Sequence, residues 1–162
     1  MTRIKRLLCV VAGWAAISAC AETYYVSKTG SDTNSGAEGS PFASVWKAVD
    51  AAADGDTILV DDGRYYFPTS TNECITVSEA LTIRSVNGLG SVEIRGQYLN
   101  GTTPTARNRR VLRLNNADAL VSGLVLSTAT SNGDEFQSTY GGGAYVQAGT
   151  LSNCVVRGCA CH

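Results

Sequence analysis

The sequence has few of the residues on which hydrolytic catalysis usually depends. It has one histidine in 162 residues, His162, which is the last residue. A serine nucleophile needs a positioned base, most often histidine, so a catalytic triad has little support. Glycoside hydrolysis needs two carboxylates set across a sugar bond. Asp134 and Glu135 are adjacent in a predicted loop, where their side chains point in different directions.

An excess of positive charge is also missing. The chain has 13 lysines and arginines against 14 aspartates and glutamates, and three of the basic residues lie within residues 1–21. Without that segment the balance is 10 against 14, a net charge of −4. Nucleic-acid binding needs a basic stripe. The only basic cluster, residues 107–110, lies in a Thr/Asn-rich stretch that we interpret as a solvated loop, so we expect no nucleic-acid partner.

No apolar run is long enough to span a membrane, and the longest lies at the N-terminus. Residues 1–21 begin with basic residues, continue as an apolar stretch and end in Ala-Cys-Ala, which suits cleavage after Ala21. This pattern predicts a signal peptide and export. Residues 17–20 also resemble a bacterial lipobox, in which an acylated Cys20 would anchor the chain in a membrane. We favour ordinary cleavage, and both routes export the chain.

Four cysteines remain outside this leader: Cys74, Cys154, Cys159 and Cys161. Export favours oxidation, so one or two disulfides are compatible with the sequence, and three pairings are open. The closing Cys-Ala-Cys-His contains thiolates and an imidazole, which suit zinc, but it lacks a second half-site. We therefore interpret these residues as part of a strand or turn.

Helix signals are confined to residues 40–55. Ser40 suits an N-cap and Pro41 a first turn, and four apolar residues between positions 42 and 49 recur at helical spacing. Three alanines continue the pattern, and Gly55 suits a left-handed C-cap. We expect one short amphipathic helix here.

After Gly55 the pattern changes to short β-branched runs bounded by Gly, Asn, Ser or Asp. No helical segment separates them, which argues against the crossover helices of an α/β sheet. The strands that we expect after the helix cover residues 56–60, 64–67, 74–77, 80–85, 92–95, 111–114, 120–126, 144–147 and 151–157.

A weak internal repeat indicates that these strands stack. Residues 79–85, 118–127 and 149–158 align on leucines that are 39 and 31 residues apart. A β-helix coil is often shorter, about two dozen residues, so we expect inserted loops. The residues predicted to face inward are Leu81, Ile83, Leu120, Leu124, Leu126 and Leu151.

The sequence therefore predicts an all-β chain that forms the start of a right-handed parallel β-helix with one N-terminal capping α-helix. We divide it into a signal peptide (1–21), a strand, loop and capping helix (22–55), and the first coils of the β-helix (56–162). A stack of repeats needs cover at both ends, and only the N-terminal end shows a cap. We therefore expect a truncated β-helix, the N-terminal part of a longer protein, and a monomer.

Five motifs between Tyr24 and Tyr66 carry a family resemblance: Tyr25-Val26-Ser27, Gly30-Ser31-Asp32, Pro41-Phe42, Gly55-Asp56-Thr57 and Gly63-Arg64-Tyr65. In this order they resemble the N-terminal segment of bacterial proteins of the pectin-lyase-like superfamily. The resemblance implies a right-handed parallel β-helix. It does not specify an activity, because that superfamily includes lyases, hydrolases and adhesins. Residues 141–161 in turn resemble the repeats of polymorphic outer-membrane proteins and autotransporter passenger regions.

Candidate site residues are few. Asp32-x-Asn34-x-Gly36 resembles part of a calcium loop, so Asp32 and Asn34 are weak calcium candidates, and we expect no other cofactor. Asp61, Asp62 and Arg64 lie close together but fill a predicted turn. Arg84 and Arg157 lie on predicted strands, where both could face solvent along one groove. No catalytic constellation is identified.

We therefore expect an exported bacterial protein, secreted or on the cell surface, with a structural or adhesive role. Its expected partners are polysaccharides or a host or cell surface. Membrane association would need an acylated Cys20 or an anchor in a missing C-terminal region. The alternative is the N-terminal part of a polysaccharide lyase or another carbohydrate-active enzyme.

Overall fold

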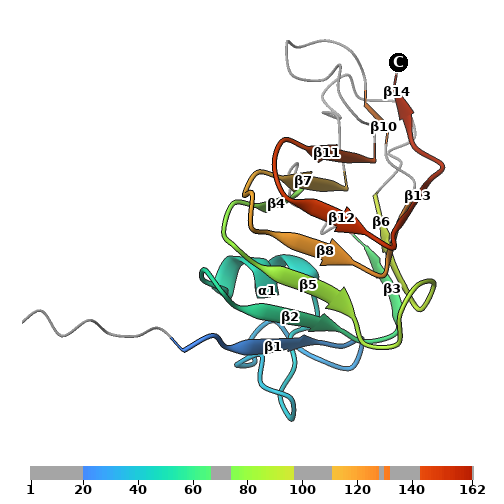
Figure 1. The fold of residues 1–162 in the computed structure, drawn as a ribbon. Helices are drawn as coiled ribbons and strands as arrows, with labels where there is room; N and C mark the ends of the chain where they lie inside the picture. The colour runs from blue at the N-terminus through green and yellow to red at the C-terminus, as the bar shows by residue number, and fades with distance from the viewer. Residues whose placement is uncertain (1–19, 67–73, 97–110, 128–129, 132–142, 162) are drawn as a thin grey trace, which may run out of the picture.

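The computed structural model of the chain describes residues 20–66, 74–96, 111–127, 130–131 and 143–161. They form one short helix and a stack of short parallel strands (Figure 1). The all-β parallel β-helix predicted from the sequence is confirmed. None of the described helical residues forms a helix long and apolar enough to cross a membrane.

Three parallel sheets form the sides of the stack. Sheet A contains, in spatial order, β1 (Thr23–Val26), β2 (Thr57–Val60), β5 (Thr82–Ser85), β8 (Leu120–Ser122) and β12 (Thr150–Ser152). Sheet B contains β3 (Gly63–Tyr66), β6 (Val92–Arg95), β9 (Leu124–Ser127) and β13 (Val155–Arg157). Sheet C contains β4 (Ile75–Val77), β7 (Leu112–Leu114) and β11 (Ala144–Val146). In addition, β10 (Thr130–Ser131) pairs with β14 (Ala160–Cys161).

Each coil takes one strand from each sheet in turn, as β2–β3–β4 and β5–β6–β7 show. The register partners Thr57, Thr82, Leu120 and Thr150 of sheet A are therefore 25, 38 and 30 residues apart along the chain. The connection from sheet B to sheet C runs from Tyr66 to Ile75 in one coil and from Arg95 to Leu112 in the next. Inserted length at this position accounts for most of the difference, and the longer connection from Ser85 to Val92 adds to it in the second coil.

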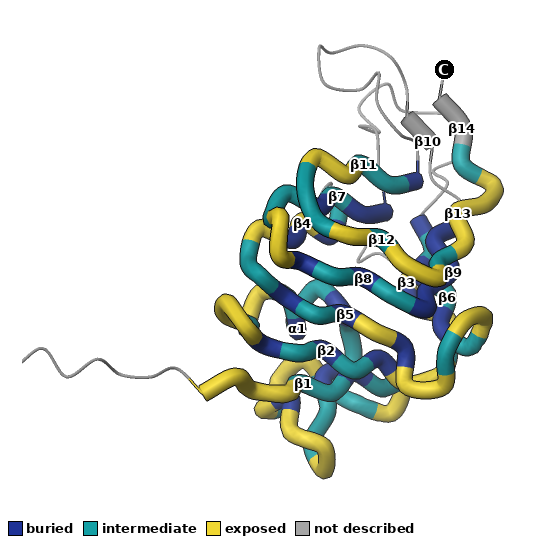
Figure 2. The backbone as a smooth tube through the Cα atoms, viewed as in Figure 1, coloured by how far each residue is buried: buried dark blue, intermediate teal, exposed yellow. Residues whose placement is uncertain are grey.

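Apolar side chains stack in ladders inside the coils. Successive residues of a strand point to opposite faces, so every second residue enters the core. In sheet A the ladder Ile58–Ile83–Val121 is 0–1% exposed, and in sheet B Ile94 lies beside Leu126 with 1% and 0% exposure. Figure 2 shows these buried positions along β2, β5 and β8. Burying each such side chain stabilises the fold by about 1.5–3 kcal/mol.

The predicted inward residues are confirmed at Leu81, Ile83, Leu124 and Leu126, which are all buried. Leu120 is a wrong prediction, because it pairs with Thr82 and Thr150 on the outward side of sheet A and is half-buried. Its neighbour Val121 takes the inward position. Leu151 pairs with Val121 in the inward ladder and is itself half-buried in the last coil of sheet A.

The helix begins later than the sequence suggested. α1 spans Val45–Ala51, and its N-cap is Ser44 rather than Ser40, with the Ser44 hydroxyl accepting a hydrogen bond from the Lys47 amide at 3.2 Å. Phe42 is extended and bridges Val26 of β1 in parallel. Ser40 is held in a turn, where its amide donates to the Ala37 carbonyl at 2.9 Å. Tertiary contacts of the preceding loop therefore decide where the helix starts.

α1 lies against β1, β2 and β4 at the N-terminal end of the stack and buries Val45 and Ala48 there (Figure 1). Its C-cap is Ala52 rather than Gly55. Gly55 instead forms the turn into β2, with a φ of +92°.

Two predicted strands, 120–126 and 151–157, are each divided by a corner. Gly123 has a φ of +73° and Asn153 a φ of +47°, in the left-handed region that glycine and asparagine adopt most readily. Each corner turns the chain from sheet A into sheet B. The residues after the corner therefore present their outward side chains on a different side of the molecule.

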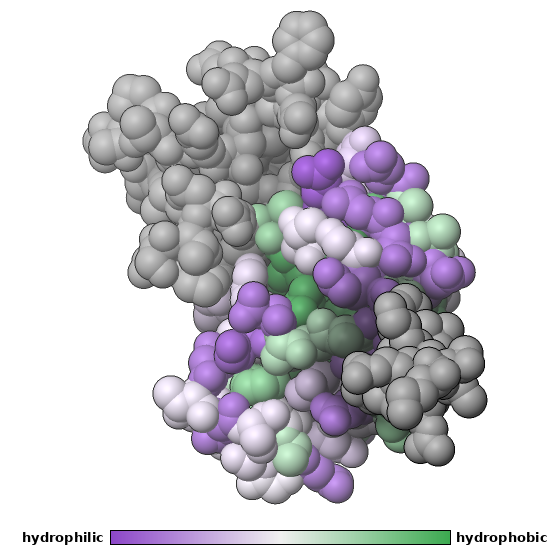
Figure 3. Space-filling model, turned by 90° about the vertical axis from the view of Figure 1, so that its left-hand side faces the viewer, coloured by the Kyte–Doolittle hydropathy of each residue, from purple (hydrophilic) through white to green (hydrophobic). Residues whose placement is uncertain are grey.

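One face of the stack carries both polar and apolar residues. Figure 3 shows the side that lies to the left in Figure 1, where hydrophilic residues surround a hydrophobic area.

Candidate functional site

The two calcium candidates hold the loop before the helix. One Asp32 carboxylate oxygen accepts hydrogen bonds from the amides of Ala43 and Ser44, both at 2.9 Å, and the other accepts from the Ser44 hydroxyl at 2.9 Å. The Asn34 side-chain amide donates to the Pro41 carbonyl at 2.9 Å. Both side chains thus have a structural role at the start of α1, and a role in calcium binding stays a prediction.

The described cysteine side chains do not pair with one another. Cys74, Cys154 and Cys159 are free thiols. Cys154 is half-buried, and this burial raises the pKa of its thiol. Within the described ranges, no group of three or more His, Cys, Asp or Glu residues could hold a metal ion. The other sequence candidates lie outside the described residues or side chains: Cys161, His162, Asp134, Glu135 and residues 107–110.

The structure separates the charged residues of the predicted turn. Asp61 accepts a hydrogen bond from the Ser27 hydroxyl at 3.4 Å, and Asp62 accepts one from the Asn87 side-chain amide at 3.0 Å. Arg64 instead extends along the outside of sheet B. Arg84 and Arg157 lie on sheets A and B, so the expectation that they share one groove is wrong.

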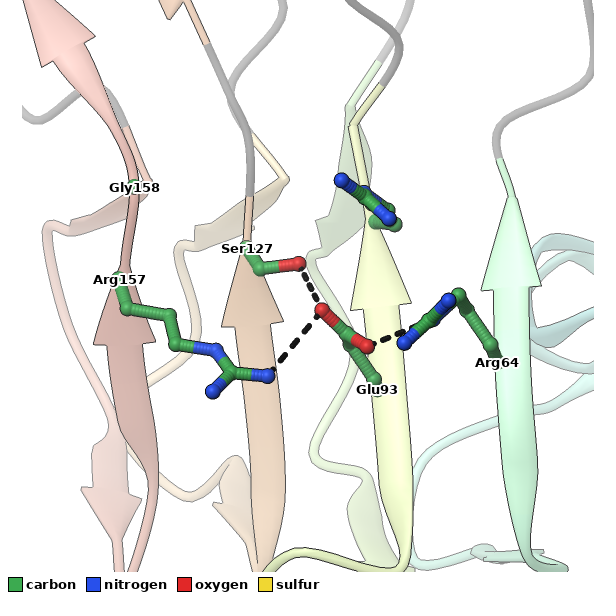
Figure 4. A pocket seen from close by; sticks show the side chains of 6 residues that line it. Arg64, Glu93, Ser127, Arg157 and Gly158 are labelled. Atoms are coloured by element: carbon green, nitrogen blue, oxygen red, sulfur yellow. Dashed lines mark hydrogen bonds and ion pairs between the residues drawn. The ribbon is translucent and has the colours of Figure 1, made fainter.

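A polar cluster occupies the outer face of sheet B. Figure 4 shows Arg64, Glu93, Ser127 and Arg157, which come from the four neighbouring strands β3, β6, β9 and β13. Each strand also supplies the core, so alternation places these side chains outside. The register sets Arg64 beside Glu93. It also aligns Arg95, Ser127 and Arg157 in a second row.

Glu93 is the centre of the cluster. Its Oε1 accepts a hydrogen bond from the Ser127 hydroxyl at 2.5 Å, and its Oε2 accepts one from Arg64 Nε at 2.7 Å. A longer contact of 3.5 Å joins Oε1 to Arg157 Nη2. The side chain of Glu93 is 14% exposed, whereas those of Arg64 and Arg157 are 51% and 62% exposed. The carboxylate therefore lies at the base of the cluster and the guanidinium groups reach solvent.

These contacts fix the charges of the cluster. The hydroxyl of Ser127 and the guanidinium of Arg64 outweigh burial and lower the pKa of Glu93 from 4.5 to about 2. The hydrogen bond to Glu93, followed by one to Tyr66, raises the pKa of Arg64. Both groups remain charged at neutral pH. The cluster is therefore suited to holding an anion or a polar ligand, and less suited to transferring protons.

The same residues surround a surface depression of about 310 Å³. It is lined by Arg64, Glu93, Arg95, Ser127, Arg157 and Gly158. Tyr66 is the register partner of Arg95 on the adjacent strand and is 52% exposed. We call Tyr66, Arg95, Ser127 and Arg157 the outer row of sheet B. It places an aromatic ring, a hydroxyl and two guanidinium groups along one line.

The sequence analysis missed Glu93, Arg95 and Ser127. Alternation within residues 92–95 would have placed Glu93 and Arg95 on the outward face. Their partners on β9 and β13 follow only from the register, which depends on connections of unequal length. No local pattern in the sequence carries that information.

Sheet C has a smaller polar contact on its outer face. The Arg113 guanidinium lies 5.7 Å from the centre of the Tyr145 ring, and its Nε donates a hydrogen bond to the Asn115 side chain at 3.1 Å. Arg113 and Tyr145 are register partners on β7 and β11. This contact joins two coils.

Comparison with known proteins supports the fold. No protein-family model matches the chain, and no curated protein matches it. Among solved structures, a rhamnogalacturonan lyase is similar, with a TM-score of 0.53 and 18% sequence identity. The match covers 69% of this chain and 32% of the lyase, so the chain spans about a third of the length of that protein.

At this identity the likeness shows the fold alone. It agrees with the parallel β-helix that the sequence resemblance implies. Nothing in the comparisons supports the resemblance of residues 141–161 to autotransporter repeats.

Proposed function

We propose that this protein is an exported bacterial β-helix protein that contacts glycans through the outer face of sheet B, in a structural or adhesive role. The observation that carries the proposal is the outer row of sheet B. Tyr66 offers an exposed aromatic face on which a sugar ring can stack, and the guanidinium groups of Arg95 and Arg157 offer hydrogen-bond donors to sugar oxygens.

The spacing of the row suits an extended ligand. Neighbouring strands of a sheet lie about 4.8 Å apart, so a row across four strands spans about 14 Å. The row runs along the stack and lies beside the depression. A linear saccharide laid along it would meet the tyrosine first and the arginines next. The rigid ladder beneath the row keeps these groups in place before a ligand binds, which lowers the entropy cost of binding.

The charge states of the cluster favour binding over catalysis. A general base works best when its pKa lies near the operating pH. The carboxylate of Glu93 has a pKa of about 2, so it is a poor proton acceptor at neutral pH. The raised pKa of Arg64 likewise keeps this guanidinium protonated. This argument supports a role that holds a glycan without cleaving it.

The proposed export rests on residues 1–21, whose basic start, apolar stretch and Ala-Cys-Ala end are typical of a signal peptide. Expression of the full chain in a bacterial host tests it. The N-terminal residue of the exported product separates the two routes, because ordinary cleavage leaves Glu22 and lipobox cleavage leaves an acylated Cys20. Retention of the uncleaved chain in the cytoplasm would contradict export.

A second candidate function is the N-terminal part of a polysaccharide lyase. The likeness to a solved structure named as a rhamnogalacturonan lyase favours it. In this case catalysis would need residues beyond those that the structure describes. Formation of an unsaturated product from rhamnogalacturonan or polygalacturonate by the purified chain, with and without calcium, would support the lyase and contradict the non-catalytic role.

Binding of the chain without residues 1–21, here called the mature chain, to a panel of immobilised polysaccharides tests glycan contact directly. We expect at least one to be bound, and Tyr66→Ala to weaken that binding about two- to tenfold through the loss of the aromatic face. Tyr25→Ala is the matched control, because Tyr25 also lies on a strand but belongs to the outward side of sheet A. Absence of binding to every polysaccharide, or equal effects of both variants, would contradict the proposal.

A further inference from the structure

The depression on sheet B carries an excess of positive charge. Three arginines and one glutamate line it, which gives a local charge of +2. The rest of the chain after residue 21 is acidic: without the four charged residues of the depression, its 10 basic and 14 acidic residues become 7 and 13. This local reversal of sign distinguishes the depression from its surroundings.

The register explains why a depression forms there. Arg95 and Arg157 occupy the same row on β6 and β13, with Ser127 of β9 between them. Strands lie about 4.8 Å apart, so the backbones that carry the two arginines are about 10 Å apart. Ser127 has a short side chain that is 3% exposed, so it forms part of the floor of the depression between the two long side chains. A small group that enters this space meets a guanidinium on either side.

Glu93 organises one side of the cluster. It accepts hydrogen bonds from Ser127 and from Arg64 Nε, which restrains both side chains. Its contact with Arg157 is 3.5 Å, at the long end of the range for a hydrogen bond. Arg157 would therefore give up only a weak hydrogen bond if its guanidinium turned toward a better acceptor. A guanidinium has five N–H donors and pairs with an oxyanion through two of them at once.

We propose that this depression binds a single oxyanion carried by a saccharide, such as a carboxylate or a sulfate ester, between Arg95 and Arg157. The inference rests on the proposed glycan contact and adds the class of glycan that is recognised. Polyanions such as nucleic acids are disfavoured, because the chain after residue 21 carries a net charge of −4 that repels a run of phosphates.

Calorimetric titration of the mature chain tests the proposal. The probes are a digalacturonate, a sulfated disaccharide, a neutral disaccharide and inorganic sulfate. We expect at least one of the two acidic saccharides to bind, more tightly than the neutral one and with an affinity that falls as salt is added. The better of the two identifies the oxyanion as a carboxylate or a sulfate ester.

Arginine variants connect this binding to the site. Arg95→Ala and Arg157→Ala should each weaken binding of the acidic saccharide about tenfold or more, because each removes a charge-assisted hydrogen bond. Arg157→Lys should retain part of the affinity, since it keeps the charge and loses the paired donors. Arg84→Ala is the matched control, because Arg84 is exposed on sheet A and its removal changes the net charge equally. Circular dichroism confirms that each variant folds.

The outcomes separate this inference from the proposed function. Equal binding of the neutral and acidic saccharides, unaffected by the arginine variants, would overturn the oxyanion site while glycan contact stands. Arginine-dependent binding of inorganic sulfate without any saccharide would support an oxyanion site and contradict the glycan role. Equal loss in Arg84→Ala and Arg157→Ala would overturn the site, because general charge would then explain the affinity.

Discussion

Two leucines of the same coil give the sharpest test of the register. Leu126 lies on β9 in the inward ladder of sheet B and is 0% exposed, whereas Leu120 lies on β8 on the outward side of sheet A and is half-buried. The sequence pattern alone places both inside. Replacing each with alanine makes the same chemical change at two positions that only the structure distinguishes.

The burial of each leucine sets the size of the effect. Leu126→Ala removes three buried carbon atoms, the Cγ methine and two methyl groups, at about 0.8 kcal/mol each, and leaves a cavity beside Ile94. We expect it to lower the free energy of unfolding by about 3–4 kcal/mol. Leu120→Ala leaves no enclosed cavity and should cost under about 1 kcal/mol, as is usual at the surface. A one-residue shift of the register would exchange the two results, because it moves every side chain to the other face.

Urea denaturation followed by circular dichroism measures both effects. With an m value of about 2 kcal/mol per M, Leu126→Ala should lower the midpoint by about 1.5–2 M and Leu120→Ala by less than about 0.5 M. Leu126→Val provides a milder change of about 1 kcal/mol if the alanine variant does not fold. Equal midpoints for the two alanine variants, or a larger loss for Leu120→Ala, would refute the assigned register.

Three further predictions concern the cluster and the N-terminal loop. The pKa of Glu93 is lowered from 4.5 to about 2, so its contribution to stability is present above about pH 4.5 and is lost as the pH falls toward 2. Urea titrations should therefore show that Glu93→Gln is less stable than the unchanged chain at neutral pH and loses less stability between pH 4.5 and 2. An unchanged slope of stability against pH would contradict the role of the carboxylate. Asp32→Ala should lower the free energy of unfolding by about 1–2 kcal/mol, and with it the thermal midpoint, because Asp32 accepts hydrogen bonds from the start of α1. Asp50→Ala is the control: it removes a surface ion pair with Lys47 and should cost about 0.5 kcal/mol or less. Gly36→Ala should cost about 2 kcal/mol or more in the same assay, because Gly36 has a φ of +81° and an added Cβ would meet the rings of Phe42 and Tyr24. Gly39→Ala should be nearly neutral, because a Cβ added at Gly39 would have no atom within 4 Å.

The sequence predicts the type of each element better than its limits. The short β-branched runs predict most strands to within one or two residues, because the period of two is local information. The start of α1 is not local. Ser40 and Ser44 both suit an N-cap, and the choice depends on the Asp32 carboxylate, which binds the amides of residues 43 and 44.

The inward side of β8 illustrates the same limit. Leu120 and Val121 are both apolar, so alternation alone allows either to face the core. The corner at Gly123 settles the phase, because it fixes where sheet A ends and thus which residue of the strand points inward. The sequence analysis treated residues 120–126 as one strand, although Ser122 and Gly123 interrupt its apolar residues.

The candidate site was the least predictable part. Glu93 and Ser127 are 34 residues apart in sequence, yet they share a hydrogen bond because β6 and β9 are neighbours in sheet B. Their pairing depends on the length of the connection between sheets B and C, which differs from coil to coil. The sequence placed charged residues on predicted strands. Only the stacking of the coils showed which of these side chains contact one another.

Nuclear magnetic resonance of the arginine side chains tests the central claim most directly, namely that the outer face of sheet B binds an acidic glycan. The Nε–Hε signals of Arg95, Arg157 and Arg84 would be assigned and followed while digalacturonate or a sulfated disaccharide is added to the mature chain. The account predicts that one of these saccharides shifts the signals of Arg95 and Arg157 in a saturable manner and leaves that of Arg84 unchanged. Equal shifts at all three arginines, or none at Arg95 and Arg157 with either saccharide, would contradict it.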